Sequence, residues 1–590
     1  YYIGSQKNPK FDDIRYFDFN VAAQAVKILD DLIKGQALTQ YQLLGVCTNA
    51  LHVTGGLKFV KEVMDRVGKY PKNYYNILAY VKWCGFYPME LRGFSPYKED
   101  HIYRNIIYAV KIPKGAVRKV EIITAISLQA GEQQLRSTME QIKKSNDMKI
   151  HVLCAPTGLG KTELILDWEK VLIAFPDHTL KEEVVSRMRV DHAFTPNIQD
   201  YLSEDDDPFV KHCYAVGAIK KASAYIISKK RGSSSYRISE QENKYEEYSK
   251  ALAQSSVSDK TVLTTHLKVQ YTTIKHDEII FDEDPFSSLF IQIQTALVND
   301  IENIRKSIKD KSDKKVLSNI LSQVVNSPYD VVLELRGNEF KDFDWIESAA
   351  AQNYSIRSNV IGFLASKFFL IDKADQNKLY FIKKYLPPAD KKVIILSATA
   401  DKWIYKKLFG DRLQFYDLGP VELQGKLLQD TSFPFSRQNL NREDVFMYAS
   451  QQARGRKKIT FLSFRDKFDN TYVDLYYGFC QGRDGCNDNQ IAVIGTPHLN
   501  PVMYKLYAKG LNLDLEPDDF KMKTQQVNRN GFCFPFYTSK NEILQNLQFY
   551  LIERDLRQAI GRARLIRRPD ANVLVLSNYP LPEAIQRNEM

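Results

Sequence analysis

Cysteine is scarce in this chain and is never arranged in closely spaced pairs. Seven cysteines occur in 590 residues, no C-x₂-C pair exists, and only Cys480 and Cys486 lie near each other. Local spacing therefore predicts neither a zinc site nor an iron–sulfur cluster. Unpaired thiols are typical of proteins in the reducing cytosol, which predicts a cytoplasmic location.

Long apolar runs are missing as well. No stretch approaches 18 consecutive apolar residues, so the sequence predicts no membrane-spanning helix and no membrane partner. The first residues lack the pattern of a signal peptide, and no repeat of 20–50 residues indicates a solenoid. The chain opens with Tyr1 instead of Met, so it could be part of a longer protein.

Neither sign of charge dominates. The chain carries 82 Lys and Arg against 71 Asp and Glu, which gives a net charge of +11 and a pI near 8.9. This moderate excess permits a nucleic-acid partner without requiring one. A hydrophobic content of 44% and a charged content of 26% are ordinary for a soluble globular protein. The length predicts about three or four domains.

A phosphate-binding pattern stands at His151–Thr162, which reads HVLCAPTGLGKT. It matches G-x-x-x-x-G-K-[ST], with Ala155 in the place of the first glycine. Glycines in such a loop let backbone N–H groups close on a polyphosphate. Lys161 would reach the β- and γ-phosphates of ATP, and Thr162 would offer its hydroxyl to Mg²⁺. The expected nucleotide-binding residues are Pro156, Thr157, Gly158, Leu159, Gly160, Lys161 and Thr162.

The segments around this loop have the spacing of regular structure. Ala130–Ile142 is expected to be a helix before it, and Glu163–Val171 a helix after it. The N-terminal dipole of the second helix would favour a bound anion. Strand, loop and helix thus follow in the order that such a site requires, which disfavours the alternative of a chance glycine turn.

An apolar strand at Ile279–Phe281 runs into the acids of DEDP, which ends in Pro285. Because proline cannot continue a central strand, the acids should lie at the carboxyl edge of a sheet, where ligands bind. Asp282 is expected to hold Mg²⁺, directly or through water, and Glu283 to act as general base on the attacking water. Acids at a strand end can also simply begin a loop; the phosphate loop upstream favours the catalytic interpretation.

Three other segments have a plainer alternative beside a functional one. The aromatic stretch Tyr70–Tyr87 could stack on bases, but helical spacing favours a core role. The acidic run Glu204–Asp207 could hold a metal, but it is more typical of a solvated loop. The basic run Lys229–Ser235 could touch a nucleic-acid backbone or be solvated.

The order of elements predicts an α/β chain with additions. Residues 1–118 are expected to form a helical N-terminal domain, and α/β alternation begins at about 119 and restarts at about 402. A long excursion at about 287–390 is predicted to be a mainly helical insertion. Ser397 and Thr399 follow a strand and could link the ATP site to a neighbouring domain through their hydroxyls. The predicted strands include Thr261–Thr265, Val393–Leu396, Lys457–Phe464, Gln490–Ile494 and Val573–Leu576.

The motifs APTGLGKT, TTH, DEDP, SATA, GTP and QAIGRAR occur in this order between about residues 130 and 580. As a set they resemble superfamily 2 helicases and translocases. The resemblance implies two RecA-like P-loop domains, at 119–404 and 405–590, which face each other across an ATP cleft. It also implies an ATP hydrolase that uses Mg²⁺ and acts on nucleic acid.

The resemblance assigns roles to residues of this chain. Lys161 and Thr162 belong to the first motif, and Asp282 and Glu283 to the second. Ser397 and Thr399 belong to the motif that couples hydrolysis to motion. The sixth motif would contribute Gln558, Arg562 and Arg564, one or both arginines acting on the γ-phosphate. The candidates for contacts with nucleic acid are Thr264, Thr265 and Thr496.

The sequence departs from the usual helicase pattern in three ways. Asp284 stands where alanine is common and Pro285 where Asp or His is common, so the chain is not a standard DEAD-box RNA helicase. The arginines of GRAR are two positions apart instead of three, which leaves open whether Arg564 or Arg567 reaches ATP. The insertion looks like that of XPD/DinG-type helicases, without their four-cysteine cluster.

Two N-terminal runs, LLGVCTNALHVTGGLKF and YPMELRGFSPY, resemble the region before the helicase in primase–helicase proteins of mobile elements. We therefore expect an ATP-dependent helicase or translocase on single-stranded or forked DNA. It would serve replication or defence of a mobile element or its host, with a primase as a candidate partner. Two alternatives remain open: an ATP-gated clamp that binds nucleic acid without unwinding it, and an RNA helicase.

Overall fold

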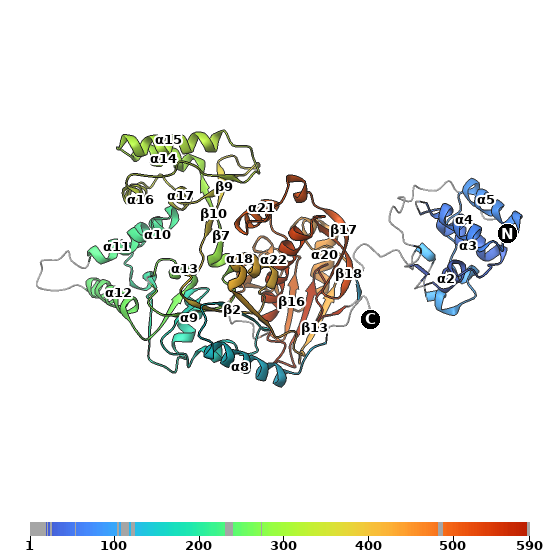
Figure 1. Cartoon of the computed structure of the whole chain (residues 1–590), viewed down its shortest axis with the longest axis horizontal. Coiled ribbons are helices and arrows are strands. Elements are labelled where there is room, and N and C mark those ends of the chain that lie inside the picture. Colours follow the sequence, from blue (N-terminus) through green and yellow to red (C-terminus); the bar gives the residue numbers. More distant parts are fainter. Residues whose placement is uncertain are drawn as a thin grey trace, which may run out of the picture. The chain divides into compact units, whose positions relative to one another are not determined.

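The computed structural model describes residues 19, 22–23, 26–53, 55–102, 105–107, 117–119, 124–229, 240–272, 274–481 and 488–586. The chain forms two compact units, Tyr1–Val117 and Arg118–Met590 (Figure 1). The first unit has a hydrophobic core of its own. Within the described ranges, no helix has both the length and the apolar character needed to cross a bilayer.

Short helices build the first unit. Asp100 is buried and accepts hydrogen bonds from the N–H groups of Lys27 and Ile28, at 2.7 and 3.1 Å, where the first described helix begins. Thr39 and Gln42 cap the next helix with reciprocal hydrogen bonds between side chain and backbone. The helices are α2 (Lys27–Ile33), α3 (Gln40–Ala50), α4 (Gly56–Val67), α5 (Asn76–Cys84) and α6 (Leu91–Phe94).

The aromatic stretch 70–87 divides between the inside and the surface of this unit. The predicted core role is correct for Tyr70, which is buried, and for the rings that pack against the core. It is wrong for Trp83, which is 86% exposed, and for Tyr80 and Tyr87, which are also exposed. The helical spacing predicted the helix but did not predict which aromatic rings face away from the core of the unit.

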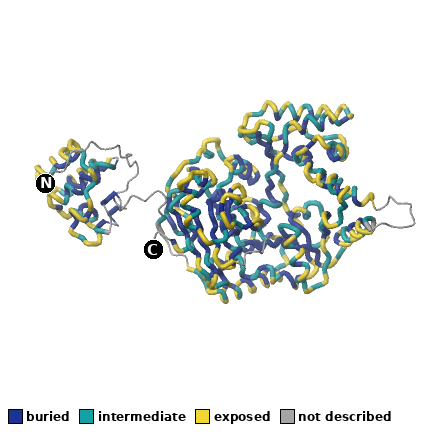
Figure 2. Tube along the Cα trace, turned by 180° about the vertical axis from the view of Figure 1, so that it is seen from behind, coloured by how far each residue is buried: buried dark blue, intermediate teal, exposed yellow. Residues whose placement is uncertain are grey.

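Seven parallel strands form the first sheet of the larger unit, in the order β12-β2-β11-β6-β3-β5-β4. Its central strands are apolar and buried, as is typical of a parallel sheet that helices cover on both faces (Figure 2). The strands predicted at 261–265, 279–281 and 393–396 are confirmed. The strands are β2 (Ile150–Cys154), β3 (Leu172–Phe175), β4 (His192–Phe194), β5 (Thr261–Thr265), β6 (Glu278–Asp282), β11 (Lys392–Ser397) and β12 (Leu413–Asp417).

The register of this sheet brings three motifs to one edge. Cys154 pairs with Ser397, and Leu396 pairs with Asp282. Because parallel strands end at the same edge, the phosphate loop, the acids of DEDP and the SATA motif lie together. β12 joins the sheet beside β2, so this sheet extends beyond the predicted domain division at 404.

A second parallel sheet has the order β15-β14-β16-β19-β13-β20. The predicted strands 490–494 and 573–576 are confirmed, whereas the strand predicted at 457–464 ends at Thr460 and continues as a 3₁₀ turn, Leu462–Phe464. The strands are β13 (Lys426–Asp430), β14 (Lys457–Thr460), β15 (Thr471–Tyr476), β16 (Gln490–Ile494), β19 (Asn572–Leu576) and β20 (Ile585–Gln586). A hairpin, β17 (Lys523–Arg529) and β18 (Phe532–Thr538), pairs with β1 (Arg118–Lys119).

Helices flank both sheets. The helix predicted at 130–142 is α8, which the side chain of Ser127 caps. The main helices of this part are α8 (Leu128–Lys144), α9 (His178–Val185), α13 (His266–Val269), α18 (Lys402–Phe409), α19 (Arg437–Leu440), α20 (Glu443–Gln452), α21 (Pro501–Gly510) and α22 (Glu542–Gly561). The fold class is therefore α/β with two parallel sheets, as predicted.

The insertion after DEDP is mainly helical, as expected, but it also contains an antiparallel sheet, β7-β10-β9-β8. Alternating Ile and Gln at 291–294 is the sequence signal of β7, and the prediction missed it. Helices α10 (Asp207–Val216), α11 (Ile219–Lys229) and α12 (Glu240–Val257) share a core with this insertion. Its other elements are β7 (Ile291–Leu297), α14 (Val298–Ser307), α15 (Lys311–Val325), β8 (Leu333–Glu334), α16 (Phe343–Gln352), α17 (Val360–Leu364), β9 (Phe368–Ile371) and β10 (Lys378–Lys384).

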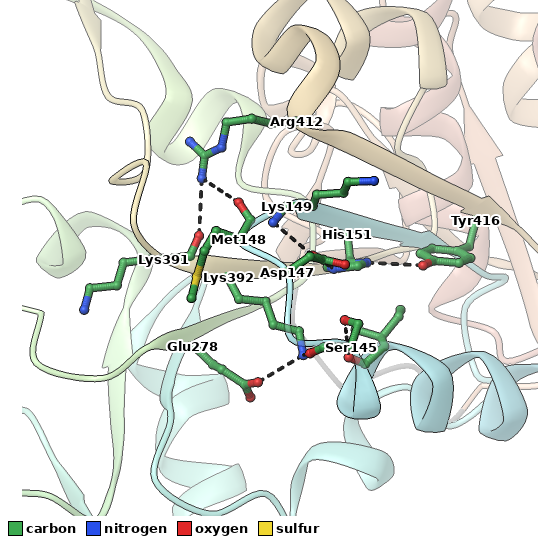
Figure 3. A network of polar contacts seen from close by, with 11 residues as sticks. Ser145, Asp147, Met148, Lys149, His151, Glu278, Lys391, Lys392, Arg412 and Tyr416 are labelled. Atoms are coloured by element: carbon green, nitrogen blue, oxygen red, sulfur yellow. Dashed lines mark hydrogen bonds and ion pairs between the residues drawn. The ribbon is translucent and has the colours of Figure 1, made fainter.

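A polar network ties the first sheet together at the opposite edge, where its strands begin (Figure 3). Lys392 is buried at the start of β11, and its Nζ binds Glu278 of β6 at 3.0 Å and the carbonyl oxygen of Ser145 at 2.8 Å. His151 of β2 binds Asp147 at 2.8 Å, and burial lowers the pKa of this histidine. The network thus links the first residues of neighbouring strands.

Arg412 closes the same network from the turn before β12 (Figure 3). Its Nη2 donates to the carbonyl oxygens of Pro388, Lys391 and Met148 at 3.0, 3.2 and 3.3 Å. One guanidinium therefore satisfies carbonyl groups from two separate segments of the chain.

We expect Arg412→Ala to destabilise the larger unit by about 2 kcal/mol, because these carbonyl groups lose a charged donor. The measurement is the shift in the urea unfolding midpoint. Lys406→Ala is the control, since the exposed Lys406 ammonium pairs with the exposed carboxylate of Asp411 and should contribute little. Equal shifts in the two variants would contradict the role given to Arg412.

Candidate nucleotide-binding site

The phosphate loop follows β2 directly and turns on two glycines. Gly158 has φ +87° and Gly160 has φ +103°, a backbone conformation that residues with a side chain rarely adopt. Ala155 donates its N–H to the carbonyl oxygen of Ser397 at 2.9 Å. The loop is therefore bent by its glycines and fastened to the neighbouring strand β11.

The prediction of a helix at Glu163–Val171 is wrong. Only Thr162–Ile165 is helical, as a single 3₁₀ turn, and the chain then bends at Lys170, with φ +57°, into β3. The indole of Trp168 is buried and donates to Glu278 Oε2 at 2.9 Å, which holds this segment against the sheet. The expected helix dipole is therefore missing, and the positive charge of the site comes from side chains.

Lys161 is buried, and its ammonium group closes the loop on itself. Nζ donates to the carbonyl oxygens of Ala155 at 2.8 Å and Pro156 at 3.2 Å. Burial lowers the pKa of Lys161, although the charges of Glu283 and Asp282 oppose the effect. To reach a phosphate, the ammonium must exchange these neutral acceptors for charged ones, which form stronger hydrogen bonds.

Thr162 and Asp282 lie side by side although 120 residues separate them. The threonine hydroxyl donates to Asp282 Oδ2 at 2.8 Å. Burial, together with the neighbouring Glu283 carboxylate, raises the pKa of Asp282 to about 7. Hydroxyl and carboxylate oxygens are the donors that Mg²⁺ prefers, and it is commonly held by one or two carboxylates with substrate phosphates. These two side chains therefore fit Mg²⁺.

No other metal site emerges from the residues that the structure describes. Among them, no group of three or more His, Cys, Asp or Glu side chains is placed to hold a metal ion. The acidic run 204–207 is not a wholly solvated loop, because Asp206 is buried and accepts hydrogen bonds from Tyr225 and Ser203 at 2.6 and 2.7 Å. Burial by itself would raise the pKa of Asp206, but the hydrogen bonds outweigh burial and lower this pKa to about 2. The basic run predicted at 229–235 lies, after residue 229, outside the described residues.

Glu283 has a strained backbone at the centre of the site. Its φ of +69° is rare for a residue other than glycine. Such a conformation persists where the surrounding structure imposes it, and Glu283 lies between two buried, hydrogen-bonded residues, Asp282 and Asp284. Its side chain lines the same pocket as Lys161.

One pocket of about 730 Å³ joins the motifs of both sheets. The first sheet contributes the phosphate loop, Asp282 and Glu283, and the segment at the end of α22 contributes arginines. Six cationic side chains and five carboxylates line it, so its charge is mixed and nearly balanced. The charged residues are Arg136, Lys161, Arg187, Arg562, Arg564, Arg567, Glu132, Glu163, Glu183, Asp282 and Glu283.

The arginines of the sixth motif hold different positions. Arg562 is buried, and its Nε donates to the carbonyl oxygen of Gln558 at 3.3 Å. Arg564 is exposed at the same pocket, with φ +51°. Gly561 comes so close to the phosphate loop that a Cβ there would lie 2.8–2.9 Å from the side-chain atoms of Thr157. We call residues 118–417, around the first sheet, the first half of the larger unit, and residues 418–586, around the second sheet, its second half. The two halves therefore touch at this glycine.

Arg567 reaches across to the phosphate loop. Its Nε donates to the carbonyl oxygen of Gly158 at 2.6 Å, and its Nη2 donates to Glu132 at 2.5 Å. Arg567, one of the two arginines that the sequence left open, therefore contacts the loop. No local sequence signal singles out Glu132, its partner on α8.

Two polar atoms near the motifs are buried without a hydrogen-bond partner among the described residues, Thr399 Oγ1 and Gln558 Nε2. The hydroxyl of Ser397, by contrast, accepts from the N–H groups of Thr399 and Ala400 at 3.0 and 2.9 Å. Buried polar groups are nearly always paired, so such exceptions are typical of sites that complete their bonds with a ligand.

The three threonines expected at nucleic acid are buried. Thr264 accepts a hydrogen bond from the hydroxyl of Thr195 at 3.1 Å. The Thr496 hydroxyl contacts Ser577 Oγ at 2.9 Å and Asn578 Oδ1 at 2.8 Å, and Thr265 is 7% exposed. Their contact with nucleic acid stays a prediction.

Two parallel sheets, with the phosphate loop on one and arginines that follow α22 in the same pocket, give this part of the chain an α/β fold with one shared site. No protein-family model and no curated protein matches the chain. Among solved structures, one titled "XPD_Helicase" is 14% identical, with 76% of this chain and 95% of that chain covered and a TM-score of 0.46.

Two further solved structures are similar to this chain. One titled "XPD_APO" is 14% identical, with 76% of this chain and 96% of that chain covered and a TM-score of 0.42. One titled "Truncated XPD" is 15% identical, with 49% and 98% covered and a TM-score of 0.28. The chemistry assigned to the pocket depends on its own residues.

We expect Gly561→Ala to separate the phosphate loop from α22, because the new methyl group would overlap Thr157. Amide hydrogen exchange of residues 157–162 should then become faster. Gly93→Ala is the control, since a Cβ at Gly93 meets no atom of the described residues within 4 Å. Unchanged exchange in Gly561→Ala would show that the two halves do not meet there in solution.

Proposed function

We propose that this chain is an ATP-dependent nucleic-acid helicase or translocase that acts on single-stranded or forked DNA. The observation that carries the proposal is the shared pocket. In it, Lys161 and Thr162, with the acids Asp282 and Glu283, stand opposite the arginines that follow α22. A triphosphate in this pocket would be contacted from both sheets at once, so its binding and hydrolysis would change how the two halves meet.

The side chains assigned to catalysis would have separate roles in ATP hydrolysis. Lys161 would leave the carbonyls of its loop for the β- and γ-phosphates, and Glu283 would take a proton from the attacking water. Arg562 would stabilise the charge that develops on the transferred phosphoryl group. Mg²⁺, held through Thr162 and Asp282, would neutralise charge on the phosphate oxygens.

The movement of the two halves would step the protein along one strand. Its grip would come from Lys, Arg and backbone N–H groups on phosphates, so it would be independent of sequence and weaker at high salt. We further propose that the first RecA-like domain extends to Asp417, because β12 completes its sheet. A primase partner and a role in mobile-element replication or defence belong to this proposal, on the N-terminal resemblance alone.

Two substitutions test the chemistry. Lys161→Ala should abolish ATP binding or turnover, and Glu283→Gln should bind ATP while turnover falls about 10²–10⁴-fold, as expected for the loss of a general base. Asp167→Asn is the control, since this exposed carboxylate pairs with Arg189 outside the pocket. Strong ATPase activity in Glu283→Gln in the presence of nucleic acid would contradict the assigned base.

The substrate is tested by ATPase stimulation and strand displacement measured side by side. We expect single-stranded DNA to stimulate turnover more than single-stranded RNA does. The stimulation should fall as salt rises, because binding to the phosphates releases counterions and this release is less favourable at high salt. If only RNA stimulates turnover, the proposed substrate would be RNA and not DNA. ATPase activity without displacement of a forked strand would favour translocation or clamping over unwinding.

A further inference from the structure

Asp284, the third acid of DEDP, is buried where the first half of the larger unit meets the second. Only 2% of it is exposed. Its Oδ1 accepts hydrogen bonds from the hydroxyl of Tyr405 at 2.5 Å and from the N–H of Phe286 at 2.9 Å. Its Oδ2 accepts one from the hydroxyl of Tyr550 at 2.8 Å. Both oxygens of this carboxylate are therefore occupied by donors.

The two tyrosines come from different halves. Tyr405 lies on α18, which follows the SATA motif, and Tyr550 lies on α22, which ends at the sixth motif. Both are fully buried, and burial, with the nearby Asp284 charge, raises the pKa of each well above its usual range. Both hydroxyls therefore remain protonated donors. In Figure 1 the labels α18 and α22 stand together in the middle of the larger unit.

The contacts of α22 with the first half come from one series of side chains. Tyr550, Arg554, Gln558 and Arg562 follow at intervals of four residues, so they lie along one broad face of the helix. Arg554 donates to the hydroxyl of Ser287 at 2.9 Å. The middle of the helix thus contacts the segment just after the general base, and its end contributes Arg562 to the pocket.

A second residue of the second half, Gln481, also meets Asp284. Gln481 donates from its side-chain amide to the backbone oxygen of Asp284 at 3.0 Å. Asp284 is thus held by the second half through its side chain and its backbone. An alanine, which is common at this position in the helicases that the chain resembles, would offer no carboxylate to Tyr550.

We propose that Asp284 is a positioning residue which, through Tyr550, fixes α22 relative to Glu283 and so sets where Arg562 stands in the pocket. The inference rests on the proposed ATPase function. Asp284 and Tyr550 are not among the residues that line the pocket. They act through the rigid helix, whose residues 550 and 562 are about 18 Å apart at 1.5 Å per residue.

The chain offers a matched pair of variants that separates this role from simple packing. Tyr550→Phe and Tyr405→Phe each remove one hydroxyl from the same carboxylate, and both sites are fully buried. Only Tyr550 lies on α22. Asp284→Asn keeps the shape of the side chain and removes its charge, so it tests the same contact by a second route.

The measurements are kcat and KM for ATP, the ratio of ATP to ADP affinity, and the unfolding midpoint. We expect Tyr550→Phe to lower kcat about tenfold or more, because small misplacements of catalytic groups have effects of this size. Its preference for ATP over ADP should also fall, since Arg562 would act on the γ-phosphate. Tyr405→Phe should lose similar stability but retain kcat and the ATP preference, and Asp284→Asn should follow Tyr550→Phe.

Equal losses of kcat in the two tyrosine variants would overturn the positioning role and leave only a packing role. So would an unchanged kcat in both Tyr550→Phe and Asp284→Asn. If Tyr550→Phe does not fold, Asp284→Asn decides alone. The failure of the proposed function itself looks different, because the unaltered protein would then hydrolyse no ATP.

Discussion

The register of three adjacent parallel strands, β2, β11 and β6, is the constraint on which the rest of the site depends. A slip of one residue would turn every side chain of a strand to the other face of the sheet. The observed register places Cys154 beside Ser397 and Leu396 beside Asp282, which brings Thr162 to within 2.8 Å of Asp282. The network around Lys392 and Glu278 joins two of these strands where they begin. The register is therefore supported at both ends of the sheet.

The second half adds positive charge to a site in which the first half contributes more carboxylates than cations. Since the loop is followed by one 3₁₀ turn and not by a long helix, Lys161 supplies the cation of the loop itself. Arg562, Arg564 and Arg567 arrive from the end of α22. The pocket balances these cations with carboxylates, and a polyanion with its own Mg²⁺ would enter such a surface with little change in net charge. The site is better described as two facing surfaces than as a loop with a ligand.

The motifs could be predicted from the sequence because each depends on local chemistry. Glycines at 158 and 160, and acids at the end of an apolar strand, indicate their roles without knowledge of the fold. The sequence could not exclude a helix after the loop. What holds Trp168 and its segment against the sheet is a hydrogen bond to Glu278, which lies 110 residues away in the chain. β12 had no signal that would assign it to the first sheet. The partners of Asp284 lie 121 and 266 residues further along the chain, which no spacing rule connects.

The boundary between the two halves is not uniform, and this difference bears on how a cleft can close. Just after DEDP, the π-helical turn Phe286–Phe290 is buried, and Phe286 stacks on Tyr507 of α21 and meets Tyr550 edge to face. At the end of α22 the contacts are instead polar and charged, through Arg567 and the pocket. Apolar interfaces resist separation, whereas polar ones exchange partners with water or ligand at little cost. In the proposed function, the halves would therefore separate most readily at the pocket, and α22 would pivot about the turn after Asp284.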